Sequence, residues 1–310
     1  MTATDSISTR AQYDRAIQSS KRVYWDIDAD VIRGRRFDAA QKFLPDSLVG
    51  PERFETLSPA ERRFVSQIQG RTYANVFGLV ERFISAKVLD LGREHALGDQ
   101  TKLEALVRFT NEELKHQKLF RRIDGLLDEA MPAGYRFDFD PDALARAVLG
   151  KSTWAVLALT LDIELFTQLH YRQSIDPDAD LSALFKDVFL YHWKEESQHA
   201  ILDELELVRH DASVDAAARD RGVDDLIELV AAVDGILRAQ AAADTAYFRA
   251  ASGRAVGDAE AAAIEAAFLA AYRWQYIHSG VQHPHFLAVL GNLISDAQGQ
   301  RIQAALATIK

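Results

Sequence analysis

Apolar residues recur every three or four positions along four long stretches of the chain, the period of α-helices with one buried face. The stretches cover residues 59–96, 101–131, 141–173 and 181–210. Turns near Gly98, near Pro132 and at residues 176–180 separate them, and no segment alternates between apolar and polar residues as a strand would. We therefore predict an all-α fold in which four helices of about 30 residues pack as a bundle.

The segments on either side of this core are less regular. Residues 11–24 predict a helix, residues 33–52 have a loop-like composition, and two or three further helices are expected after the segment of residues 211–224. The motif "SPAE" at Ser58–Glu61 combines a capping box with proline at the first helical position, so the first core helix should begin there. We expect a single domain over residues 1–310. Its parts are a core over 58–210, an N-terminal extension over 1–57 and additional C-terminal helices over 221–310.

One set of residue types occurs twice in the core. Each half has a Glu-x-x-His motif on the second helix of a hairpin and a glutamate inside an apolar run of the first helix. In both halves this glutamate precedes the glutamate of the motif by 32 positions. The two pairs are 81 with 113 and 164 with 196. All three positions recur at an offset of 83 residues, as from 81 to 164. The six residues are Glu81, Glu113, His116, Glu164, Glu196 and His199.

The spacing brings these six side chains to one level of the bundle. The midpoint of 81 and 113 is residue 97, and the midpoint of 164 and 196 is residue 180, so each set is centred on a predicted turn. Residues three apart also share a helix face. Four carboxylates converging in a core would repel one another unless cations neutralised them. We therefore predict a dinuclear metal site, the alternative being isolated glutamates that face solvent.

Composition narrows the chemistry and the partners. The chain has no cysteine, so a metal must be held by oxygen and imidazole nitrogen, which suits iron, manganese or zinc. A net charge of −10 and a pI near 5.4 argue against nucleic acid as a partner. The sequence has neither an apolar run long enough to span a membrane nor an apolar leader segment. We expect a cytoplasmic protein without membrane contact.

The six-residue set resembles that of the ferritin-like di-iron and di-manganese carboxylate proteins, in which two helices give one glutamate each and two give Glu-x-x-His. The resemblance covers residues 58–210 and implies two iron ions as cofactor, with manganese or a mixed manganese–iron pair as alternatives on the same ligands. Glu112 and Glu195, which precede the motif glutamates, resemble the acidic residues that hydrogen-bond ligand histidines in such proteins. The alternative is that both are solvated surface glutamates.

His192 breaks the repeat, because its counterpart 83 residues earlier is Phe109. A histidine four residues before the last Glu-x-x-His motif resembles the extra iron ligand of the p-aminobenzoate N-oxygenase family. Chain length and the helical C-terminal extension are also similar. The alternative is a core histidine bonded to a neighbour. The resemblance implies a di-iron monooxygenase that uses O2 and an external electron donor to oxidise an arylamine to a hydroxylamine or nitro product.

Other activities use the same type of site. A C–H hydroxylase, a desaturase or a decarboxylase is an alternative, and a ferroxidase-like iron-handling protein is a further one. We expect no catalytic residues beyond the metal ligands, and a homodimer remains an option. The substrate, a small organic molecule, would contact residues within about one turn of the ligands. These candidate pocket residues are Phe77, Gly78, Phe109, Thr110, Thr160 and Trp193, each of which is alternatively an ordinary core residue.

The C-terminal stretch "YRWQYIHSGVQHPHF" gathers three further histidines, His278, His283 and His285, among aromatic residues. Pro284 interrupts their helical register, so they lack the spacing of a metal site on one helix face. A structural role is favoured over lining a cavity mouth, binding substrate or forming an interface.

Overall fold

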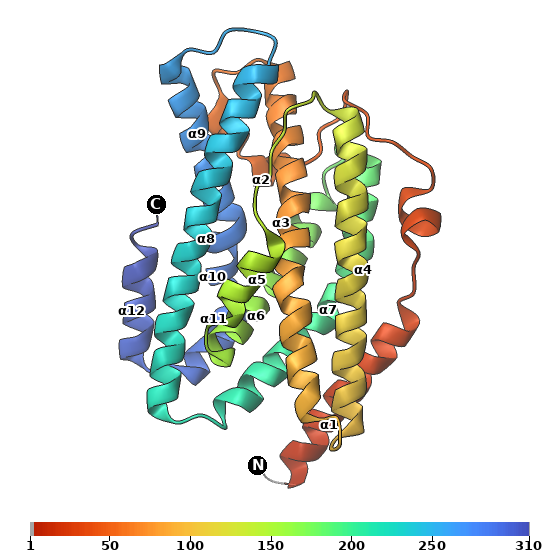
Figure 1. The fold of residues 1–310 in the computed structure, drawn as a ribbon, viewed down its shortest axis with the longest axis vertical. Helices are drawn as coiled ribbons and strands as arrows, with labels where there is room; N and C mark the ends of the chain where they lie inside the picture. Colours follow the sequence, from red (N-terminus) through yellow and green to blue (C-terminus); the bar gives the residue numbers. More distant parts are fainter. Residues whose placement is uncertain (1–2, 310) are drawn as a thin grey trace.

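The computed structural model describes residues 3–309 of the chain, and side chains from residue 10 onward. The described part is a helical bundle without a strand, its one extended pairing being an isolated bridge between Lys42 and Leu181 (Figure 1). The predicted all-helical class is therefore confirmed. Among the residues described, no helix combines the length and apolarity that a membrane span requires.

Helices α3 (Pro59–Glu94) and α4 (Gln100–Ala130) form the first hairpin and lie side by side along the length of the bundle (Figure 1). The predicted capping box is present: Ser58 Oγ accepts a hydrogen bond from the Glu61 amide, and Glu61 Oε2 accepts one from the Ser58 amide. The carboxylate of Asp99 caps the start of α4 in the same way. These caps place the turn of the hairpin close to the predicted position at Gly98.

The third predicted helix is interrupted, which the sequence pattern did not indicate. It consists of α5 (Pro141–Leu149) and α6 (Thr153–His170), followed by the π-helical turn η3 (Tyr171–Ile175). Gly150 ends α5, and Ser152 begins a new helix by accepting a hydrogen bond from the Ala155 amide. The Ser152 amide is held by Asp225, 2.9 Å away. The break occurs because a serine cap and a tertiary hydrogen bond outweigh the continuous apolar period.

Helix α7 (Ala183–Asp211) packs against α6 to form the second hairpin. The N-terminal extension contains α1 (Ala3–Arg22), the π-helical turn η1 (Ile27–Ile32), α2 (Asp46–Val49) and the 3₁₀ turn η2 (Pro51–Phe54). Helix α1 begins earlier than predicted and packs against both α4 and α7. The buried Tyr13 hydroxyl fixes this contact by donating to Glu206 Oε1 at 2.5 Å.

The C-terminal part contains more helices than the two or three expected. They are α8 (Ala216–Ala251), α9 (Asp258–Arg273), the π-helical turn η4 (Trp274–His278), α10 (Ser279–Val281), α11 (Pro284–Leu293) and α12 (Asp296–Leu306). Helices α8 and α11 pack on α6, and α12 lies against α8 at the edge of the molecule (Figure 1). The extra elements are short helices started by Pro284 and by the Ser295 capping box.

Candidate metal centre

The seven predicted ligands lie in the core at the level where α3, α4, α6 and α7 meet. Helix α3 supplies Glu81, α4 supplies the first Glu-x-x-His pair, α6 supplies Glu164, and α7 supplies His192 with the second pair. None of the seven is more than 3% exposed. The alternative in which the glutamates face solvent is therefore wrong.

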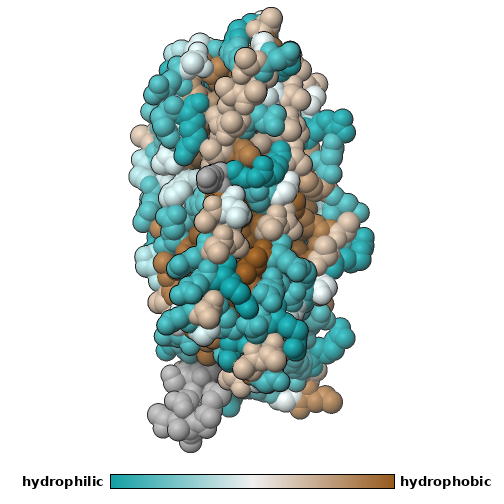
Figure 2. All heavy atoms as spheres, turned by 90° about the vertical axis from the view of Figure 1, so that its left-hand side faces the viewer, coloured by the Kyte–Doolittle hydropathy of each residue, from teal (hydrophilic) through white to brown (hydrophobic). Residues whose placement is uncertain are grey.

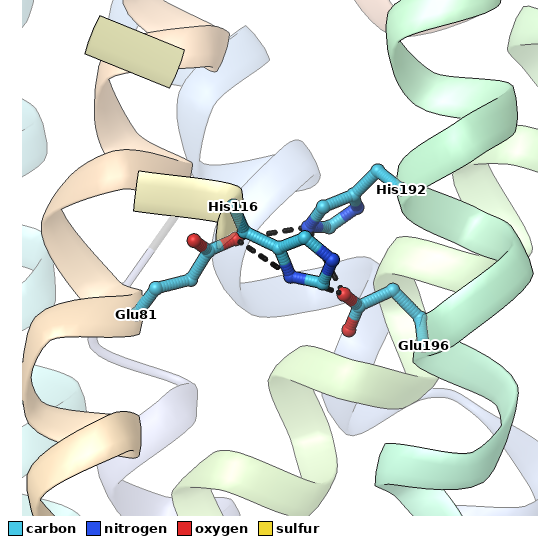
Figure 3. A group of neighbouring side chains, drawn as sticks. All are labelled: Glu81, His116, His192 and Glu196. Carbon is cyan, nitrogen blue, oxygen red and sulfur yellow. Dashed lines mark hydrogen bonds and ion pairs between the residues drawn. The ribbon is translucent and has the colours of Figure 1, made fainter. Parts of the chain in front are cut away.

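Two overlapping groups bring potential ligand atoms within 4.8 Å of one another. The first consists of Glu81, His116, His192 and Glu196, which point toward a common centre from three helices (Figure 3). The second consists of Glu113, His116, Glu196 and His199. Glu164 belongs to neither group but lies beside the second, with Oε1 3.9 Å from His199 Nδ1. Because the groups share His116 and Glu196, they form one continuous cluster.

Several nitrogen atoms of the cluster lie close to carboxylate oxygens. His192 Nε2 lies 2.9 Å from Glu81 Oε1 and 3.1 Å from Glu196 Oε1. Glu196 Oε1 is also 3.1 Å from His116 Nδ1. Distances of this size between atoms with lone pairs leave little room for anything larger than a metal ion or shared protons.

Each of the seven side chains has at least one buried nitrogen or oxygen without a hydrogen-bond partner among the residues described. The atoms are Glu81 Oε2, both carboxylate oxygens of Glu113, His116 Nδ1, Glu164 Oε2, His192 Nδ1, Glu196 Oε1 and His199 Nδ1. Buried polar atoms are normally paired, because an unpaired one retains the cost of losing water. Imidazole and carboxylate donors of this kind suit iron, manganese or zinc. The cluster could therefore hold metal ions.

Two further glutamates hold the histidines of the opposite hairpin. Glu195 Oε2 on α7 is 2.8 Å from His116 Nε2 on α4, and Glu112 Oε2 on α4 is 2.9 Å from His199 Nε2 on α7. Both glutamates are buried, so the alternative of solvated surface residues is wrong. With Nε2 engaged, Nδ1 of each imidazole is directed into the cluster, as the carboxylate partners of metal-bound histidines usually arrange.

Sequence reasoning missed the residues that support these glutamates. Lys115 Nζ lies 2.5 Å from Glu195 Oε1, and Gln198 Nε2 donates to Glu112 Oε2 at 2.9 Å. Positions 115 and 198 share the 83-residue offset of the ligands, a signal that could have identified both. Ser20 Oγ also donates to Glu112 at 2.6 Å, and the Trp25 ring contacts the Lys115 ammonium at 3.9 Å and stacks with the His116 imidazole at 6.0 Å.

The electrostatics of the cluster favour a cation among the carboxylates. Burial raises the pKa of Glu81 well above its ordinary value, and the negative charge of Glu113 adds to this effect. Burial raises the pKa of Glu164 too, reinforced by the neighbouring Glu196. Without a cation, these carboxyl groups therefore keep protons to limit their repulsion.

The histidines divide into two types. Burial lowers the pKa of His192 to about 3, opposed by the charge of Glu196 and reinforced by His116 and His199, so its imidazole is neutral and free to ligate. Burial opposes protonation of His116 and His199 as well. Hydrogen bonds and negative charges of the surrounding glutamates outweigh it and raise both pKa values.

Asp203 is a buried acidic residue that the repeat did not reveal, because its counterpart 83 residues earlier is Phe120. It lies one turn beyond His199 on α7, and its Oδ2 has no hydrogen-bond partner among the residues described. Burial raises its pKa well above the ordinary value, opposed by His199 and reinforced by the charge of Glu113. Asp203 could have been identified from the sequence by its position four residues after His199, which puts both on the same helix face.

The residues predicted to line a substrate pocket lie around the cluster as packing groups. Phe77 meets the His192 ring edge to face at 5.4 Å, and Phe109 stacks on His199 at 3.9 Å. The hydroxyls of Thr110 and Thr160 each donate to the carbonyl one turn earlier, at Leu106 and Val156. Gly78 packs closely on Phe120, and Trp193 stacks on Tyr171 at 4.9 Å. A substrate contact for any of the six stays a prediction.

The three C-terminal histidines have different environments. His283 caps α11, whose first residue is Pro284, and His285 pairs with Glu204 at 2.7 Å near the surface. His278 lines a cavity next to α6. None of the three belongs to either ligand group, and their role stays a prediction.

The fold and the cluster define a class: an all-helical protein with a buried carboxylate–histidine site able to hold metal ions. No protein-family model matches the chain. No curated protein shows significant similarity to it either.

Proposed function

We propose that the protein is a dinuclear iron oxygenase that uses O2 to oxidise a small organic substrate, with N-oxygenation of an arylamine as the leading version. The observation that supports this proposal most strongly is the position of the His192 imidazole. Its Nε2 lies 2.9 Å from Glu81 Oε1 and 3.1 Å from Glu196 Oε1, and this contact with two members of the six-residue set supports a role as the seventh donor. A histidine at this position, added to the six-residue set, is the feature that resembles the N-oxygenases within the wider ferritin-like class.

Two metal ions account best for the two overlapping groups. His116 and Glu196 are common to both groups, which is the arrangement expected when two ions are close enough to share ligands. The pairing of hairpins α3–α4 and α6–α7 supports a ferritin-like bundle as the scaffold. Two iron ions held there would supply the electrons and the binding site that activate dioxygen.

The protein residues position and insulate this chemistry. Glu112 and Glu195 orient the imidazoles of His199 and His116. The Phe77 and Phe109 rings cover His192 and His199 and keep water from the ligand atoms. A dry site strengthens the bonds between ions and carboxylates and protects reactive oxygen from side reactions with solvent.

A single-turnover experiment tests the proposal. The protein is loaded anaerobically with two equivalents of Fe²⁺, mixed with O2 and p-aminobenzoate, and its products are separated by mass. Oxidation of an arylamine to a hydroxylamine uses one O2, two electrons and two protons and releases one water, so the two Fe²⁺ ions provide the electrons. We expect one hydroxylamine per chain, with one oxygen atom from ¹⁸O2.

Other outcomes identify the alternatives. Oxidised iron with an unchanged amine, together with an oxidised C–H substrate, would replace N-oxygenation by hydroxylation, desaturation or decarboxylation. Continued uptake of Fe²⁺ and O2 without an organic product would indicate a ferroxidase-like protein. The Glu113→Ala variant is the control, because it removes one ligand and should give no product under any of these activities.

A further inference from the structure

A large cavity lies on the far side of α6 from the metal cluster. Its volume is about 1150 Å³, and helices α6, α8, α11 and α12 form its walls. Most of the lining is apolar, as with Leu159, Leu226, Val230, Phe286 and Leu290. Figure 2 faces this side of the molecule and shows apolar side chains gathered at mid-height between hydrophilic ridges. The volume is that of a site for an organic molecule rather than for a single ion.

One buried polar side chain in the wall has an unpaired oxygen among the residues described. Asp162 on α6 is 5% exposed, and its Oδ1 has no hydrogen-bond partner among the residues described. Gly280 on α10 allows this placement, because a Cβ atom at position 280 would overlap the carboxylate oxygens. A buried carboxylate without a partner is costly, so it indicates a group that a ligand would satisfy.

Asp162 is the buried acidic group of the cavity wall that no basic side chain binds among the residues described. Asp234, which also lines the cavity, is bound by Arg238 at 2.7 Å and by Arg273 at 2.6 Å. His278 faces the cavity as well, and burial lowers its pKa, so it contributes no positive charge near neutral pH. A ligand that donates a hydrogen bond would therefore find an unpaired acceptor at Asp162.

Helix α12 covers the cavity without filling it. None of its residues is buried, and its apolar Ile302 and Leu306 line the cavity while remaining partly exposed. Surface contacts hold the helix, with Arg301 and Gln298 both bonded to Asp220. A cover held by surface bonds can move aside to admit a ligand at little cost.

This cavity is separate from the metal cluster. None of the seven ligand residues lines it. Asp162 precedes Glu164 by two residues, and two residues turn an α-helix by about 200°, so the two side chains leave α6 on opposite faces. The cavity is therefore independent of the proposed oxygenase activity.

We propose that this cavity binds a small organic cation, an alkyl- or arylalkyl-ammonium compound. Its ammonium group hydrogen-bonds to the carboxylate of Asp162, and its apolar body lies along α8 and α11 beneath α12. An ammonium ion next to a buried carboxylate forms a charge-assisted hydrogen bond, which distinguishes an amine from an alcohol of the same shape.

Calorimetric titration with n-octylamine and with 1-octanol tests the proposal on the full chain without metal. We expect octylamine to bind at least tenfold more tightly than octanol, since a hydrogen bond to a charged group is involved. Asp162→Asn should remove this preference while octanol binding is kept. The matched control is Asp203→Asn, which removes a buried carboxylate with an unpaired oxygen outside the cavity and should leave octylamine affinity unchanged.

A second variant locates the ligand. Val230→Trp places a large side chain in the cavity and should abolish binding of both octylamine and octanol, with circular dichroism reporting that the fold is kept. Octylamine that binds Asp162→Asn as tightly as wild type, or that binds neither protein at millimolar concentration, would overturn the proposal. Competition between octylamine and Fe²⁺ would also overturn it, because the amine would then be at the metal cluster.

Discussion

Glu195 on α7 lies 2.8 Å from Nε2 of His116 on α4, although the two residues belong to different hairpins. The reciprocal contact joins Glu112 on α4 to His199 on α7 at 2.9 Å. Each Glu-x-x-His helix therefore orients the histidine of the other. The two contacts fix α4 against α7 at the level of the candidate ligands and give the cluster an approximate two-fold symmetry.

These contacts should control metal affinity. Glu112→Gln and Glu195→Gln replace the carboxylate with a neutral amide of the same size, so the histidines become weaker and less well oriented donors. We expect each variant to bind Fe²⁺ about 10- to 100-fold more weakly. Glu104→Gln is the control, because this residue is on α4 but paired with Lys21 and Arg108 at the surface. Unchanged affinity in both test variants would contradict the orienting role.

His192 should bind metal rather than serve as a core histidine. His192→Phe introduces the residue found at the equivalent position of the first half, and we expect it to weaken the binding of one of two ions by tenfold or more. His170→Gln is the matched control. His170 is also buried with a pKa lowered to about 3 by burial, but it is hydrogen-bonded to Tyr73 and Ser279. Equal metal titrations for wild type and His192→Phe would make His192 a packing residue.

The candidate ligands could be predicted from the sequence because their spacing follows the helical period and recurs in both halves. The 83-residue offset, the turns at equal distance from each pair and the missing counterpart of His192 can all be read without a structure. The contacts of Ser20 and Trp25 could not be predicted from the sequence, because they depend on how α1 and the following segment pack across the hairpins. The break at residues 150–152 was missed since the apolar period continues through it, while Asp225, a residue remote in sequence, holds the new start.

Asp244 should make stability depend on pH. Burial raises its pKa to about 7, against the hydrogen bonds from Tyr272, Thr72 and Gln240. The folded protein therefore binds more protons than the unfolded chain between about pH 4 and 7, and its stability falls as pH rises through that range. Relative to Asp244→Asn, we expect wild type to lose on the order of 3 kcal/mol of unfolding free energy between pH 5 and 8.

Urea unfolding at several pH values measures this difference. Asp234→Asn is the control, because the paired arginines outweigh burial and lower the pKa of Asp234, which therefore stays ionised above pH 5. Its effect on stability should be constant over the same range. A difference between wild type and Asp244→Asn that does not vary with pH would show that Asp244 titrates normally.

Replacement of two helical glycines by alanine should have opposite effects on stability. A Cβ at Gly70 on α3 would lie 2.7 Å from Phe43 Cβ and 2.9 Å from the Phe43 carbonyl, so Gly70→Ala should destabilise the protein by about 1–3 kcal/mol. A Cβ at Gly235 on α8 meets nothing within 4 Å, and Gly235→Ala should stabilise by about 0.5–1 kcal/mol. Thermal unfolding compares the two. Equal effects would mean that the segment carrying Phe43 does not pack on α3 as described.

The metal content of the protein tests the central claim most directly. The purified chain is titrated anaerobically with Fe²⁺, and bound iron is measured after removal of free ions, with Glu196→Ala as the variant that lacks a residue common to both ligand groups. We expect two ions per wild-type chain and a marked loss in the variant. An absence of bound metal in wild type, or equal binding by Glu196→Ala, would show that the buried cluster is not a metal centre.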